Sequence, residues 1–134
     1  MVFSKFSVFS QQVLSLALLL GWMGVIFAFS SLSGVATVSP PPLWYFIERK
    51  GAHVVEYAVL MLLAFRFFRL TFTKETFGRV FILAALFSLT YGATDELHQF
   101  FVPFRGAHLT DVLIDGVGVL CMGAVIIFFQ KTKD

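Results

Sequence analysis

The run LTDVLIDGVGVLCMGAVIIFF, residues 109–129, decides the fold. It is mostly apolar and close to the ~20 residues that a helix needs to cross a lipid bilayer. Asp111 and Asp115 nevertheless lie near its beginning. An ionised side chain inside a membrane helix costs roughly 2.5–3.5 kcal/mol, so such residues usually pair with one another or serve a function. This run therefore predicts a membrane-spanning helix with a polar site at one end.

Three further apolar runs of similar length precede this one, at residues 8–29, 51–68 and 80–102. Of the 134 residues in the chain, 58% are hydrophobic and 13% are charged. Soluble domains are about 25% charged, so this balance is typical of a membrane protein. We therefore predict an all-α integral membrane bundle of four transmembrane helices, forming a single domain over residues 1–134.

The first run has a second interpretation, as a secretory signal peptide. Lys5 precedes the run, and the small residues at 34–36 resemble a cleavage site. The run is longer than the about 7–15 apolar residues of a signal peptide, which favours an uncleaved helix. Beyond it, the prolines at 40–42 predict an exposed connection, and the aromatic residues at 44–46 predict an interfacial segment that enters the second helix.

The Lys and Arg residues predict the orientation. Seven of them lie at the two termini and in the loop between the second and third runs, and three lie in the other two connections. Cytoplasmic segments of membrane proteins carry the excess of Lys and Arg. Both termini are therefore predicted to be cytoplasmic, and the two remaining connections face outward.

Polar side chains lie at the beginning of the second run, at the end of the third and at the beginning of the fourth. In an up-and-down bundle these three ends meet on the outward side. Within each run the polar residues recur at three- and four-residue spacing, which places them on one helix face. These faces should turn inward, because lipid would leave their polar groups without hydrogen bonds. Their residues are His53, Glu56 and Tyr57; Ser88, Gly92, Asp95, Glu96 and Gln99, with His98 at the edge; and Asp111, Asp115, Gly118 and Met122.

One alternative is that these residues only bond the helices to one another. Polar pairs between membrane helices contribute about 0.6 kcal/mol each on average. His53 with Asp95, or Arg105 with Asp111, would be pairs of this kind. The five carboxylates at this end exceed their cationic partners, which weakens that interpretation for the whole set.

Other classes of site and partner have less support. Three histidines and several carboxylates are suitable metal ligands, but their spacing matches no known metal motif, so we predict no metal and no cofactor. The net charge of +2, with the basic residues spread over short loops, argues against a nucleic-acid partner. The single Cys121 excludes an intramolecular disulfide.

Two long motifs occur in a fixed order. The first is RKGAHVVEY at residues 49–57, and the second joins DELHQFFVPFR at 95–105 to DVLIDGVG at 111–118. These motifs resemble those of the VanZ-like family of small bacterial membrane proteins. The resemblance implies a multi-pass protein of the bacterial cytoplasmic membrane. It also suggests a contribution to glycopeptide resistance, since the name-giving member is associated with low-level resistance to teicoplanin, a lipid-tailed antibiotic that acts outside the membrane.

The resemblance extends over residues 22–123. Trp22 and the FSS stretch at 29–31 also fit the family pattern. Phe104 is a departure, because relatives often carry glycine before the arginine. This difference concerns the geometry of the loop between the third and fourth runs.

The expected function is an outward-facing polar pocket that binds or modifies the headgroup of a membrane lipid or lipid-linked cell-wall precursor. Whether the protein is an enzyme stays open. The alternatives are a proton- or ion-coupled carrier and a non-catalytic structural subunit. A homo-oligomer is a further expectation, because four short helices enclose little space. The candidate acid/base residues are His53, Glu56, Asp95, Glu96 and His98, and the candidate ligand-binding residues are Lys50, Tyr57, Gln99, Arg105, Asp111 and Asp115.

Overall fold

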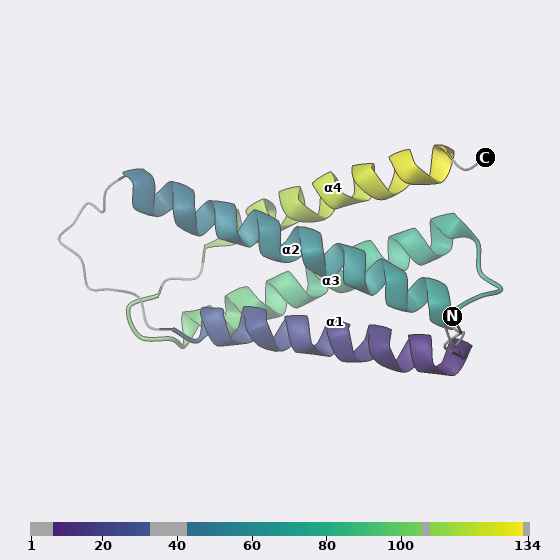
Figure 1. Cartoon of the computed structure of the whole chain (residues 1–134). Helices are drawn as coiled ribbons and strands as arrows, with labels where there is room; N and C mark the ends of the chain where they lie inside the picture. Colours follow the sequence, from purple (N-terminus) through teal and green to yellow (C-terminus); the bar gives the residue numbers. More distant parts are fainter. Residues whose placement is uncertain (1–6, 33–42, 106–107, 133–134) are drawn as a thin grey trace, which may run out of the picture.

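The described residues fold as a bundle of four antiparallel helices. The computed structural model describes residues 7–32, 43–105 and 108–132. The elements are α1 (Val8–Ser30), α2 (Leu43–Thr71), α3 (Phe77–Phe100) and α4 (Leu109–Lys131). The end of α1, the beginning of α2, the end of α3 and the beginning of α4 lie at the same end of the bundle, here called the polar end (Figure 1). The predicted all-α architecture with four helices is confirmed.

Lipid explains the outer surface of this bundle. Helices α1, α3 and α4 are long and apolar enough to cross a membrane. Large apolar side chains on these helices are more than half exposed, for example Leu20 at 56%, Leu86 at 57% and Leu120 at 74%. Such a surface is unfavourable in water and suits the interior of a bilayer. The chain is therefore a membrane protein.

Helix α2 lies at the centre of the bundle. Both α2 and α3 contact all the other helices, and α2 does so more extensively, whereas α1 and α4 do not contact each other within the described residues. Tyr57, Leu60, Met61 and Ala64 of α2 are fully buried, and they form the middle of the apolar core. The core residues contributed by the other helices are Leu19, Ile26, Ala84, Val119 and Ile126.

Helix α2 is longer than the sequence predicted. It begins at Leu43 rather than at residue 51, so the aromatic stretch at 44–46 lies in the first turn of this helix. The apolar pattern marks only the apolar part of a helix, and α2 also includes the charged residues at 48–50. The positions at 34–36 and 40–42, expected as a cleavage site and an exposed connection, lie outside the described residues.

Helix α3 ends at Phe100, two residues before the predicted end at 102. Pro103 disfavours helical backbone at the residue before it, and a turn follows in which the amide of Arg105 donates to the carbonyl of Val102 at 3.1 Å. Phe104 is the third residue of this turn and has a φ of 59°. Proline at the second residue of a turn and a positive φ at the third are the pattern of a type II turn. Glycine is favoured at that third residue, which here is Phe104. A glycine at position 104 would adopt this φ without steric strain.

Replacing Phe104 with glycine is expected to raise the free energy of unfolding by about 1 kcal/mol, because glycine adopts a positive φ without steric cost. Unfolding by sodium dodecyl sulfate in mixed micelles, followed by circular dichroism, measures the change. Phe101→Gly is the matched control, because Phe101 is similarly exposed but has a φ of −91°. Equal losses of stability in both variants would show that contact of the rings with lipid outweighs backbone strain.

Candidate functional site

A buried pair of side chains joins α2 to α4 near the polar end. The Nδ1–H of His53 donates to Oδ1 of Asp115 at 3.0 Å, and the two residues are only 4% and 1% exposed. Gly92 of α3 faces the same place. A Cβ atom on Gly92 would lie 3.1 Å from Oδ2 of Asp115 and 3.2 Å from Cε1 of Tyr57. The absence of a side chain at position 92 therefore allows three helices to meet around this pair.

Tyr57 lies one helical turn below His53. Their rings are nearly parallel, with centroids 6.5 Å apart. Tyr57 is fully buried, and its hydroxyl has no hydrogen-bond partner among the described residues. A buried tyrosine hydroxyl usually finds a partner, and this one can still donate and accept a hydrogen bond.

Asp95 joins α3 to the end of α1. The hydroxyl of Ser30 donates to Oδ2 of Asp95 at 2.6 Å, and Nε2 of Gln99 donates to the same oxygen at 2.8 Å. All three residues are buried. The other oxygen of Asp95, Oδ1, and the amide oxygen of Gln99 accept no hydrogen bond in the described part of the chain.

Glu96 joins α3 to the beginning of α4. Its Oε1 accepts the backbone N–H of His108, the N-cap residue of α4, at 2.6 Å. A carboxylate at this position is favourable, because the first amides of a helix have no partner within the helix and carry partial positive charge. Oε2 of Glu96 is buried and has no partner within the described ranges.

The two cations predicted to bind a ligand have partners inside the protein. Lys50 forms an ion pair with Asp111 across α2 and α4. The guanidinium of Arg105 donates to the carbonyl oxygens of Phe29 at 2.6 Å and Ser30 at 2.5 Å. Arg105 therefore caps the end of α1, whose last carbonyl groups have no partner within the helix.

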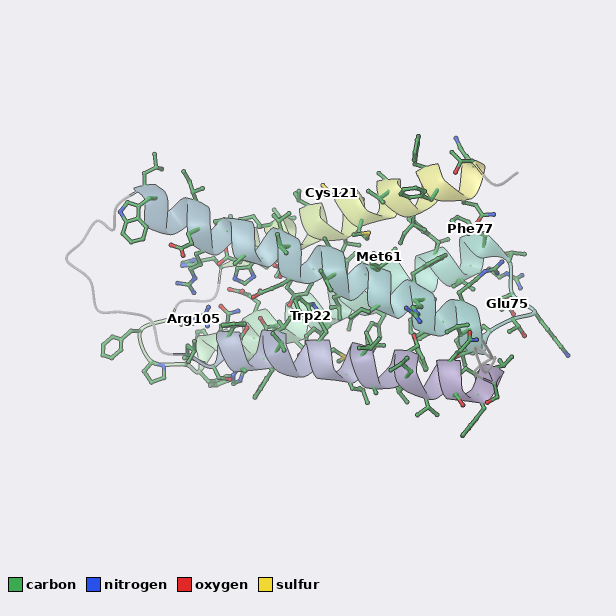
Figure 2. All side chains as sticks on the ribbon, in the orientation of Figure 1. Trp22, Met61, Glu75, Phe77, Arg105 and Cys121 are labelled. Carbon is green, nitrogen blue, oxygen red and sulfur yellow. The ribbon has the colours of Figure 1, made fainter. Side chains whose placement is uncertain are left out.

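Two predicted site residues lie at the margin of the cluster. His98 faces α1, where Nε2 is hydrogen-bonded to the hydroxyl of Ser31 at 3.0 Å and the ring stacks on Phe27 at 4.6 Å. Glu56 is only half-buried, and its backbone carbonyl accepts the indole N–H of Trp22 at 2.9 Å. Figure 2 shows Arg105 at the polar end and Glu75 at the opposite end of the bundle.

The inward orientation of the three polar faces is confirmed, since most of their residues are buried. The exceptions are Glu56, His98 and Met122, which are partly exposed. Both pairings considered from the sequence are wrong. His53 bonds Asp115 instead of Asp95, and the partner of Asp111 is Lys50 instead of Arg105.

The contribution of α1 could not be found from the sequence. Ser30 is 3% exposed and links Asp95 to Gln99, whose Nε2 also lies 3.3 Å from the serine hydroxyl. A single serine at the end of an apolar run has no periodic pattern around it. The only signal was its place in the FSS stretch that fits the family pattern.

The described residues hold no group of three or more His, Cys, Asp or Glu side chains arranged to bind a metal ion. What the site offers is one imidazole–carboxylate pair, one tyrosine hydroxyl and three further oxygen acceptors. Such a set can exchange protons or accept hydrogen bonds from a ligand.

The fold and this site define a class of protein, namely a small helical membrane protein with buried polar residues gathered at one end. A family model described as VanZ/LLP1 matches residues 8–130, which is nearly the whole chain. The chain belongs to the VanZ/LLP1 family. Neither a curated protein nor a solved structure matches it.

Proposed function

We propose that the polar end binds the headgroup of a membrane lipid or of a lipid-linked cell-wall precursor. The observation that carries this proposal is the distribution of buried polar atoms without a hydrogen-bond partner. Within the described ranges there are five such atoms, and four of them belong to Tyr57, Asp95, Glu96 and Gln99. Each buried unsatisfied group costs about 1–3 kcal/mol, so four of them on the inward faces of α2 and α3 favour a site that a ligand completes.

The orientation is part of the proposal. The excess of Lys and Arg at the opposite end supports cytoplasmic termini in a bacterial cytoplasmic membrane. The polar end then lies in the outer leaflet, where lipid headgroups and exported wall precursors are found. This location is consistent with a contribution to resistance against a lipid-tailed glycopeptide such as teicoplanin, which acts on that side.

Catalysis at this site would use His53 and Asp115. A carboxylate that accepts the Nδ1–H of a histidine fixes the ring orientation and leaves Nε2 to take or give a proton. A hydroxyl or an amine of the bound headgroup would be the partner of Nε2. Binding alone requires no such transfer, and both versions depend on the same residues.

Tyr57→Phe tests whether a ligand is bound at this site. The tyrosine hydroxyl has no partner in the described chain, so its removal is expected to leave stability unchanged within about 0.5 kcal/mol. Retention of a lipid-soluble ligand is expected to fall about fivefold, because one hydrogen bond of about 1 kcal/mol to the headgroup is lost. Native mass spectrometry of protein extracted from its own membrane measures retention.

Tyr91→Phe is the matched control. The hydroxyl of Tyr91 donates to the backbone carbonyl of Met23 at 2.7 Å, so this variant is expected to lose about 1 kcal/mol of stability and to retain ligand normally. If no ligand is retained by the wild type, or if Tyr57→Phe retains as much as Tyr91→Phe, the polar end is not a headgroup site.

A further inference from the structure

The atoms without partners at the polar end are mainly acceptors. Oδ1 of Asp95, Oε2 of Glu96 and Oε1 of Gln99 are buried oxygens that accept no hydrogen bond within the described residues. An ionised carboxylate and an amide oxygen cannot donate. The hydroxyl of Tyr57 is the single atom of the four that both donates and accepts. With both carboxyl groups ionised, a ligand that satisfies these atoms must bring donors.

The charges at the polar end also favour a cationic ligand. Glu56, Asp95, Glu96 and Asp115 place four carboxyl groups at this end, with the imidazole of His53 bonded to one of them. The nearby cation Lys50 is paired with a fifth carboxylate, that of Asp111, and Arg105 caps α1. A second anion, such as a phosphate, would add to this negative charge in a medium of low dielectric constant, where uncompensated charge is costly.

The acceptors are also close along the helix. Asp95, Glu96 and Gln99 lie within five consecutive residues of α3, a rise of about 6 Å along its axis at 1.5 Å per residue, and all three are buried. The bond between Oδ2 of Asp95 and Nε2 of Gln99, 2.8 Å long, holds two of these side chains together. A primary ammonium has three N–H donors around a single positive charge. It therefore matches the acceptors in number and in sign.

We infer that the ligand enters the polar end with a primary ammonium group, which donates hydrogen bonds to the side-chain oxygens of Asp95, Glu96 and Gln99. This inference rests on the proposed function and names the chemistry of the group recognised. Two sources supply it, an ethanolamine phospholipid and the free amine of a peptide on a lipid-linked wall precursor. The phosphate of either molecule stays outside the acceptor cluster.

Two phospholipids with matched acyl chains test whether the ligand is recognised through its N–H donors. Phosphatidylethanolamine and phosphatidylcholine both carry a phosphate and a cationic nitrogen, but only the first has N–H donors. The wild-type protein, delipidated and titrated in detergent, is expected to retain phosphatidylethanolamine at least tenfold better by native mass spectrometry. The second source is tested with a lipid-linked peptide precursor, whose free amine is compared with its acetylated form.

The variant Glu96→Gln tests whether Glu96 takes part in recognising the ammonium group. Its side-chain oxygen still accepts the N–H of His108, while the oxygen without a partner is replaced by an NH₂ donor. The preference, which is the ratio of retained phosphatidylethanolamine to retained phosphatidylcholine, is expected to fall about tenfold. Glu75→Gln is the control, since Glu75 lies in the exposed turn at the opposite end, and it should keep the preference.

The possible outcomes separate this inference from the proposed function. Retention that depends on Tyr57 but is equal for phosphatidylethanolamine and phosphatidylcholine, with no effect of acetylating the precursor, would overturn the ammonium and leave headgroup binding intact. Better retention of phosphatidylglycerol would overturn it in favour of hydroxyl groups. An equal loss of preference in Glu96→Gln and Glu75→Gln would also contradict the inference, because the effect would then reflect net charge alone.

Discussion

Replacing Asp115 with alanine is expected to lower the free energy of unfolding by about 3 kcal/mol, because removing one member of a buried pair leaves the other unsatisfied. Asp115 is 1% exposed and accepts from His53, which is 4% exposed. Without the carboxylate, the Nδ1–H of His53 lies buried without its acceptor, and the space beside Gly92 is left empty. Unfolding by sodium dodecyl sulfate in mixed micelles, monitored by circular dichroism, measures the change.

Asp111→Ala is the matched control on the same helix. Its partner Lys50 has a side chain that is 32% exposed, so the ammonium turns to water when the carboxylate is removed. The loss is expected to stay below about 1 kcal/mol. The double variant His53→Ala with Asp115→Ala should be more stable than the sum of the two single losses predicts, because donor and acceptor disappear together. Additive losses would show that the pair contributes little.

The sequence predicted helix faces well and pairings poorly. Asp95 and Gln99, like Asp111 and Asp115, are spaced by four residues, and this spacing alone places each pair on one face. It does not determine how far one helix is shifted along another. That shift decides whether His53 meets Asp95 or Asp115, and it depends on apolar packing and on the glycines.

The roles of the cations were hidden for a different reason. Arg105 was predicted to bind a ligand because its planar fork suits carboxylates and phosphates. The same donors suit the last carbonyl groups of a helix, and the structure shows that α1 ends beside this guanidinium. Residue type cannot distinguish the two uses, and only the path of the chain does. Ser30 was missed for the same reason, since its importance comes from Asp95 on another helix.

The boundaries show where hydropathy stops being informative. The apolar run at 109–129 matches α4 (Leu109–Lys131) closely, because that helix is apolar along nearly its whole length. The run at 51–68 captures little more than half of α2 (Leu43–Thr71), since both ends of that helix extend beyond the apolar stretch. Apolar sequence therefore predicts the full length of a helix only where the helix is apolar to its ends.

Replacing Gly118 with alanine is expected to lower the free energy of unfolding by about 2–3 kcal/mol, through steric overlap between α4 and α2. A Cβ atom at this position would overlap the carbonyl oxygen of Val54 and lie 3.1 Å from the amide nitrogen of Ala58. These are backbone atoms of a helix, which cannot rotate aside. The two helices would have to separate, and the separation would also lengthen the bond between His53 and Asp115. Ligand retention should therefore fall together with stability.

Gly116→Ala provides the matched control two residues earlier on α4. The nearest atom to a Cβ there is Cδ2 of Leu89 at 3.6 Å, an ordinary van der Waals distance. Alanine also favours a helix over glycine by up to about 1 kcal/mol, so this variant is expected to be neutral or slightly stabilised. If both variants lose equal stability, glycine is needed on α4 for a reason other than its approach to α2. If neither does, α2 and α4 pack less closely than the structure shows, and the position of Asp115 beside His53 needs another cause.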